Sequence, residues 1–241
     1  MLQHLQGKTT IPIPELIAFG ERDDEWTYVI LTKLQGVMLE SVWGNCSNDE
    51  KKNLVERIGK MIAEVHSVQV GILSSLEPQW KIFLDQQLTK FYDRHKRLGM
   101  PDWFTLHVEN FVKESISVMQ SQTELVILTC EYTPFNLLVD NKLGQWNICG
   151  MIDFGDAMIG YHEYDLIGPL LFLTEGNADL VRSLLHSYGY SDVEINQNLR
   201  RRLMLLSILH RYSNFKFQLR IPDWQERVKS IDELEELIFP L

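Results

Sequence analysis

Two apolar, strand-like segments in this sequence end in polar side chains that could meet. Segment 125–129 is followed by Glu131 and Asn136, and segment 146–152 is followed by Asp153. Residues 140–144 read Asp-Asn-Lys-Leu-Gly and are typical of a turn, so a short hairpin would bring Asn136 and Asp153 together. An amide oxygen and a carboxylate suit Mg²⁺, which takes few protein ligands and keeps water or phosphate oxygens. Because a further carboxylate could accept a hydroxyl proton, these residues indicate a phosphoryl-transfer site.

Each of these residues also has an ordinary structural interpretation. An Asp-Phe-Gly sequence, as at 153–155, is common in turns because Asp and Gly are ordinary turn residues. Asn136 alone could end a strand by bonding to its own backbone. The ordered set of residues favours the chemical interpretation over these alternatives.

In these motifs the chain resembles the aminoglycoside phosphotransferase family, a branch of the protein-kinase-like fold. Four further segments resemble landmarks of that family, in the family's order: 13–20, 28–36, 62–66 and 160–166. The resemblance implies that Asn136 and Asp153 bind Mg²⁺ and that Glu131 stands at the position of the catalytic aspartate. It also implies that ATP is the cosubstrate and that its adenine meets the backbone from Thr32 to Leu34.

The catalytic loop departs from the family pattern. Thr129, Cys130 and Glu131 occupy the positions of its His, Gly and Asp. Glutamate keeps the carboxylate but moves it by about 1.5 Å, and a misplacement of roughly 1 Å can cost about a hundredfold in rate. We therefore expect Glu131 to serve as a weak base.

The beginning of the sequence lacks features that the family places in its small lobe. No glycine-rich phosphate loop, strand lysine or helix glutamate precedes residue 15. The resemblance therefore implies an α+β, protein-kinase-like two-lobe fold with a truncated small β lobe. We expect residues 1–35 to form the remnant of that lobe and the hinge, and residues 36–241 to form a large, mainly helical lobe.

Two functions are compatible with these sequence features. The first is an ATP-dependent phosphotransferase that acts on a hydroxyl of a small, amino-bearing molecule. The second is a catalytically weak or inactive kinase-like binding protein. A shortened version of a longer enzyme would reconcile the two. Asp165 is expected to tie loop backbone together rather than to act in catalysis.

Periodicity predicts the elements that position these residues. Strands are expected at 15–20, 26–32, 125–129, 136–139 and 146–152, and helices from Asn48, over 78–98 and over 108–119. The remaining chain is expected to be helical around 163–174, 178–188, 193–220 and 223–238. Strand 26–32 or its neighbour would have an unpaired edge, which predicts self-association.

Composition limits the partners of the chain. A formal net charge of −10 over 241 residues argues against nucleic acid as a partner and is compatible with a cationic small-molecule acceptor. No apolar run is long enough to span a bilayer, and the start has no secretory pattern. Since Cys46, Cys130 and Cys149 show no paired spacing, we expect a reducing, cytoplasmic location without membrane attachment.

Overall fold

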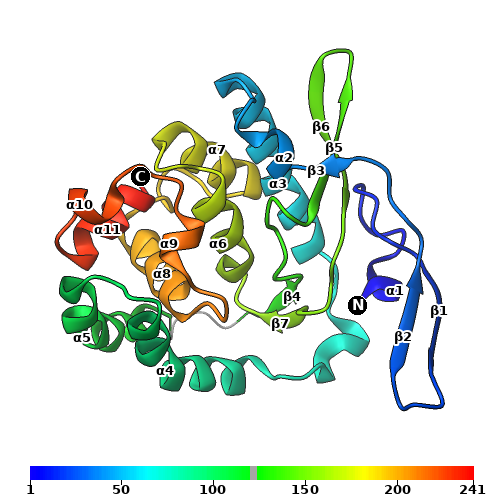
Figure 1. The fold of residues 1–241 in the computed structure, drawn as a ribbon, viewed down its shortest axis with the longest axis horizontal. Helices are drawn as coiled ribbons and strands as arrows, with labels where there is room; N and C mark the ends of the chain where they lie inside the picture. The colour runs from blue at the N-terminus through cyan, green and yellow to red at the C-terminus, as the bar shows by residue number, and fades with distance from the viewer. Residues whose placement is uncertain (120–123) are drawn as a thin grey trace.

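The computed structural model describes residues 1–119 and 124–241, and it shows a helix-rich α+β fold with small sheets (Figure 1). The larger part is a helical body. The first two strands stand beside this body as a separate hairpin. No helix in the described ranges combines the length and the apolar character that a membrane crossing requires.

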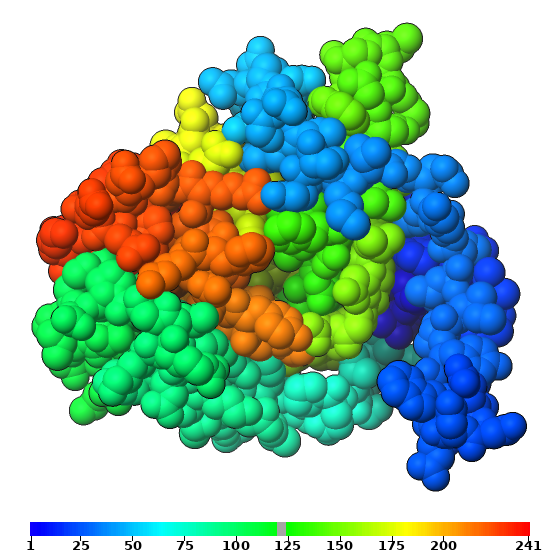
Figure 2. Space-filling model, in the orientation of Figure 1, coloured from blue at the N-terminus to red at the C-terminus, as the bar shows by residue number. Residues whose placement is uncertain are grey.

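The hairpin consists of β1 (Leu16–Glu21) and β2 (Thr27–Leu31), which pair antiparallel. It agrees with the two strands predicted around the turn at 21–25. Its apolar side chains are unusually open: Phe19 is 74% exposed, and all five residues of β2 are exposed. Figure 2 shows the hairpin projecting from the body at the lower right.

The sheet nearest the candidate site has the order β3 (Val37–Met38), β5 (Leu137–Lys142), β6 (Gln145–Met151). Strand β5 runs longer than predicted and β6 begins one residue earlier, because the turn between them is confined to Leu143 and Gly144. Both residues have positive φ, 55° and 82°, as a tight two-residue hairpin turn requires. A separate two-stranded sheet pairs β4 (Val126–Leu128) with β7 (Met158–Gly160).

Helix α3 (Asn48–His66) is the central helix of the body and packs closely against α7 (Ala178–Tyr188). It begins with a capping box, in which the Ser47 side chain accepts from the Glu50 backbone N–H and the Glu50 side chain accepts from the Ser47 backbone N–H. The approach of the two helices depends on Gly59, where an added Cβ would lie 2.1 Å from Ser187 Oγ.

The described residues form further helices, several of which pack against α8 rather than against this pair. They are α1 (Leu2–Leu5), α2 (Glu40–Trp43), a 3₁₀ helix (Gly71–Ser75), α4 (Trp80–Arg97), α5 (Asp102–Met119), α6 (Glu163–Phe172), α8 (Gln197–Leu209), α9 (Phe215–Gln218), α10 (Trp224–Arg227) and α11 (Ile231–Ile238). The helix predicted over 108–119 begins earlier, at Asp102.

The predicted single helices over 193–220 and 223–238 are wrong. Helix α8 ends at Leu209, and the loop 210–214 is held by the Arg211 backbone N–H, which donates to the Tyr164 hydroxyl at 3.1 Å. Helix α11 starts separately because the Ser230 side chain caps it by accepting from the Glu233 N–H. Both interruptions, the loop 210–214 and the start of α11, depend on local polar contacts, whereas the apolar pattern of the sequence continues through them.

Candidate active site

Asn136 and Asp153 lie at the ends of paired strands, as the predicted hairpin requires. Leu137 of β5 pairs with Met151 of β6, and the next backbone contact is the Ile152 N–H donating to the Asn136 carbonyl at 2.9 Å. Asp153 then adopts a left-handed conformation, with φ of 64°. Its Oδ1 accepts from the Gly155 N–H at 3.1 Å, which fixes the carboxylate in the turn.

Glu131 joins this pair directly. Its Oε2 accepts from the Asn136 side-chain amide at 2.6 Å, which leaves the amide oxygen of Asn136 free for another partner. Burial, together with the negative charges of Asp153 and Asp156, raises the pKa of Glu131 to about 8. Three carboxylates therefore gather at one place.

Asp156 and Arg211 form the charged rim of the group. Arg211 Nη1 lies 2.7 Å from Asp156 Oδ1, and its guanidinium lies 4.8 Å from the ring centroid of Phe83. Sequence reasoning missed this pair, since Arg211 lies far along the chain in the loop after α8. The Asp-Phe-Gly-Asp sequence was the one available signal for Asp156.

Asp165 holds the loop that carries Glu131. Its carboxylate accepts from the backbone N–H groups of Thr129 at 2.9 Å and Cys130 at 2.7 Å. The His66 ring is its third partner, at 3.2 Å. The predicted tie between Asp165 and loop backbone is therefore confirmed. Cys130 has φ of 62°, the conformation that glycine adopts most easily, which explains why the family pattern has glycine here.

The donor set at Asn136 and Asp153 fits a hard divalent cation. It consists of one amide oxygen and one carboxylate, and a cation there would favour the ionised forms of the neighbouring Glu131 and Asp156 carboxyl groups. Across residues 1–119 and 124–241, no group of three or more His, Cys, Asp or Glu side chains is arranged to hold a metal. A cation here would therefore take most of its ligands from nucleotide and water.

The residues predicted to contact the nucleotide base, Thr32 and Leu34, line a different cavity from the one that Asp153 lines. Asp153 lines a cavity of about 480 Å³ between α1, the hairpin and the 153–155 turn. Thr32 and Leu34 line a neighbouring cavity of about 490 Å³. The Thr32 N–H already donates to the Glu15 carbonyl at 3.0 Å, so Leu34 is the better candidate for a backbone contact.

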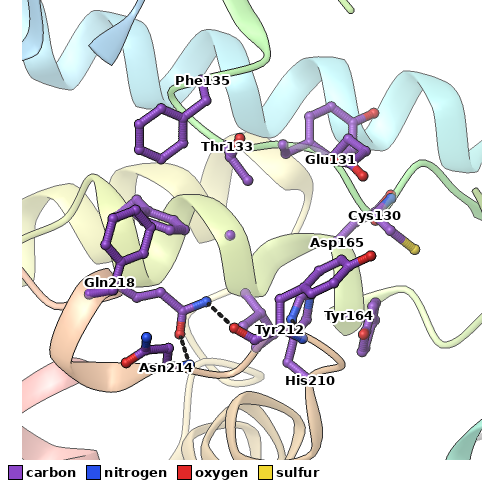
Figure 3. A pocket seen from close by; sticks show the side chains of 15 residues that line it. Cys130, Glu131, Thr133, Phe135, Tyr164, Asp165, His210, Tyr212, Asn214 and Gln218 are labelled. Carbon is purple, nitrogen blue, oxygen red and sulfur yellow. Dashed lines mark hydrogen bonds between the residues drawn. The ribbon is translucent and has the colours of Figure 1, made fainter. Parts of the chain in front are cut away.

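A third cavity, of about 270 Å³, opens beside Glu131 within the helical body. Figure 3 shows Glu131 and Thr133 on one side of this cavity, with Tyr212, Asn214 and Gln218 facing them. His210 also lines it, and burial lowers the pKa of its ring to about 3. The cluster of carboxyl groups therefore lies between two cavities, one beside the hairpin and one within the helical body.

Comparison with known proteins gives the context of this geometry. The sequence profile described as "Phosphotransferase enzyme family" matches residues 1–205. Among curated proteins, the chain is 21% identical over 223 residues to "Lysine-specific demethylase JMJ21" from Arabidopsis thaliana. That match covers 76% of this chain and 23% of the relative, so the chain spans about a quarter of that protein's length.

Solved structures of aminoglycoside phosphotransferases share the fold. The GDP complex of wild-type aminoglycoside 2'-phosphotransferase-IIIa is 19% identical, with a TM-score of 0.69 over 98% of this chain and 78% of that chain. The streptomycin-ATP-APH(2")-IIa ternary complex is 16% identical, with a TM-score of 0.56 over 99% and 80%. A thermostable mutant of APH(4)-Ia with AMP-PNP and hygromycin B is 17% identical, with a TM-score of 0.56 over 86% and 72%.

Proposed function

Because this chain belongs to the phosphotransferase enzyme family, we propose that it moves the γ-phosphoryl group of ATP to a hydroxyl of a small molecule. The observation that carries this proposal is the meeting of Asn136, Asp153 and Glu131 at the ends of β5 and β6. The solved relatives include complexes with ATP and with GDP, which supports a nucleoside triphosphate as the donor. We infer an acceptor that carries an amino group, because the Glu131 carboxyl group lines the cavity beside the site.

In this proposal Asn136 and Asp153 hold Mg²⁺. The bound ion would supply neutralisation of phosphate charge. The backbone bonds within the 153–155 turn keep the Asp153 carboxylate in place. The bond from the Asn136 amide N–H to Glu131 leaves the amide oxygen of Asn136 available as a ligand.

Glu131 is the proposed base that accepts the proton of the acceptor hydroxyl. It can do so only as a carboxylate, and its pKa of about 8 favours the protonated form at neutral pH. A cation at Asn136 and Asp153 would offset one neighbouring negative charge and lower this pKa. Asp165 supports Glu131 indirectly by fixing the two preceding backbone N–H groups.

We propose that the nucleotide base contacts the segment from Thr32 to Leu34, with Leu34 as the backbone partner. This segment and the cavity beside Asp153 adjoin along residues 14–16 and 31–32. We further infer a cytoplasmic location, where ATP is abundant and the cysteines Cys46, Cys130 and Cys149 stay free.

A second function, a catalytically weak binding protein, is favoured by one observation. The described residues that line the cavity beside Asp153 include no lysine or arginine. The triphosphate would therefore meet little positive charge from these residues beyond a bound cation. Since orientation can contribute as much as roughly 7–11 kcal/mol to a reaction, a loosely held phosphate would react slowly.

Nucleotide consumption separates the two functions. We would measure ATP consumption with Mg²⁺ across a panel of hydroxyl acceptors, for the parent protein and for Glu131→Gln. A rate near one per second, typical of kinases, that falls about tenfold or more in Glu131→Gln supports the transferase. Nucleotide binding without turnover on any acceptor favours the binding protein.

A further inference from the structure

The cavity beside Glu131 has exposed aromatic side chains at its rim. Tyr212 is 61% exposed and Phe217 is 60% exposed, and both line the cavity. Figure 3 places Tyr212 on the side of the cavity opposite Phe135 and Glu131. Large aromatic groups left open at a concave site gain free energy when a ligand covers them. The rim of the cavity is therefore suited to contact the apolar surface of a ligand.

One wall of the cavity consists of three phenylalanine rings and reaches the rim at Phe217. Phe135 stacks on Phe217 with ring centroids 5.9 Å apart and an interplanar angle of 13°. Phe172 meets Phe135 edge-on, at 5.7 Å and 90°. These rings come from the catalytic loop, α9 and the end of α6, so the apolar wall is formed by tertiary packing.

The cavity offers few charges to a cationic ligand. Among its described lining residues, the carboxylates are Glu131 and Asp165. Asp165 is 2% exposed, and its oxygens accept from two backbone N–H groups and contact the His66 ring. Glu131 alone remains for a ligand. A buried ammonium group needs a carboxylate or several acceptors, so the cavity can satisfy one such group at most.

The polar side chains on the side of the cavity opposite Glu131 are neutral, and some of their hydrogen-bonding atoms already have partners. The Gln218 side chain accepts from the Asn214 N–H at 2.8 Å and donates to the Tyr212 carbonyl at 3.4 Å. The Tyr212 N–H donates to His210 Nδ1 at 3.2 Å, so the neutral ring carries its proton on Nε2. Neutral donors and acceptors of this kind orient a ligand without requiring charge on it.

We propose that this cavity binds a compact alcohol with a planar or branched apolar body and at most one ammonium group, rather than a polycationic amino sugar. The apolar body covers the rings of Tyr212 and Phe217, and the hydroxyl lies at Glu131. The volume of about 270 Å³ is near the lower limit of ordinary ligand sites, roughly 300 Å³, and suits a single ring. The reaction of that hydroxyl rests on the proposed function, whereas the binding does not.

Titration calorimetry on the full chain tests the binding without any turnover. The probes are phenylalaninol, 2-phenylethanol, 2-aminoethanol and kanamycin. The first two carry the apolar body, the third carries only the ammonium and hydroxyl groups, and the fourth is a polycation. We expect phenylalaninol and 2-phenylethanol to bind at least tenfold more tightly than either of the others.

Variants locate the binding. Phe217→Ala should weaken phenylalaninol binding about fivefold or more, because ring stacking is lost. Trp26→Ala is the matched control, since Trp26 is an aromatic residue that is 72% exposed and lies outside the lining of this cavity. Phenylalaninol should bind this control as it binds the parent protein.

The results separate this inference from the proposed function. Binding of phenylalaninol that depends on Phe217, with no phosphoryl transfer to any acceptor of the panel, would support the inference while contradicting the transferase. Tightest binding or fastest phosphorylation of kanamycin would overturn the inference while leaving the transferase intact. Equal affinity of Phe217→Ala and the parent for phenylalaninol would also overturn it.

Discussion

The β3–β5–β6 sheet and the β1–β2 hairpin contain similar valines in opposite surroundings. Val139 of β5 is fully buried, whereas Val29 of β2 is 61% exposed. The inner part of the β5–β6 pair, at residues 137–139, Ile148 and Met151, is buried against the helical body, and its strand ends hold Asn136 and Asp153. The hairpin has two strands in its sheet, and its apolar side chains remain largely open. An isolated two-stranded hairpin is marginally stable in water.

Because the sheet is buried and the hairpin is exposed, we expect the two regions to have separate roles. The body fixes the catalytic loop through buried bonds such as those of Asp165. The hairpin lies on the other side of the cavity beside Asp153, so a nucleotide bound there would contact both regions. Stability should therefore depend on the body, while nucleotide affinity should depend on how well the hairpin closes over the site.

The largest expected effect is the difference in the free energy of unfolding between variants at Val139 and at Val29. Val139→Ala should lower the free energy of unfolding by about 1.5–3 kcal/mol, because a fully buried side chain loses its packing. Val29→Ala should change it by less than about 0.5 kcal/mol. Denaturant unfolding measures both. Equal destabilisation would mean that the hairpin is part of the same cooperative unit.

Replacing Asp165 should have the next largest effect. Asp165→Asn keeps the shape but cannot accept from both backbone N–H groups of the catalytic loop, so stability should fall by about 1–3 kcal/mol. Asp85→Asn is the control, since that exposed side chain pairs with Lys81 at the surface. A stable but inactive Asp165→Asn would point to a direct role in catalysis.

The pH dependence of stability should show a buried carboxyl in the body. Burial raises the pKa of Glu235 to about 7. The folded state then binds more protons than the unfolded state between about pH 4.5 and 7, so stability should decrease as pH rises through this range. Glu235→Gln should flatten that slope, and the exposed neighbour Glu236→Gln should preserve it. An unchanged slope in Glu235→Gln would assign the effect to another group.

The smallest expected effect concerns the edge of the hairpin. We expect weak, concentration-dependent self-association through β2, because an open apolar strand edge can pair with a second copy. Sedimentation should show that Ile30→Lys weakens this association about tenfold. Leu143→Lys, at the exposed turn of β5–β6, should leave it unchanged. A parent protein that stays monomeric at all concentrations would contradict this prediction.

The sequence predicted the parts of the site that depend on local order. Asn136 and Asp153 follow strands joined by a short turn, so their meeting needed only the hairpin. The start of α3 was also predictable, because Asn48-Asp-Glu-Lys follows Ser47 in a capping pattern.

The parts that depend on distant contacts were not predictable. Asp156 meets Arg211 through the loop after α8, and the apolar pattern of 193–220 concealed that loop. No motif in the sequence marks Phe172 or Phe217, and the packing of α6 against α9 brings them to one cavity. The pKa of Glu131 likewise depends on burial and on charges from the turn after β6.

Mg²⁺-dependent nucleotide binding by Asp153→Asn tests the central claim most directly. Asparagine tolerates the positive φ of this position, so the variant removes the charge while keeping the fold, which a thermal melt would verify. We predict that the parent and Asp85→Asn bind ATP more tightly with Mg²⁺ than without it, and that Asp153→Asn loses this difference. Undiminished Mg²⁺-dependent binding by a folded Asp153→Asn would contradict a metal site at Asn136 and Asp153.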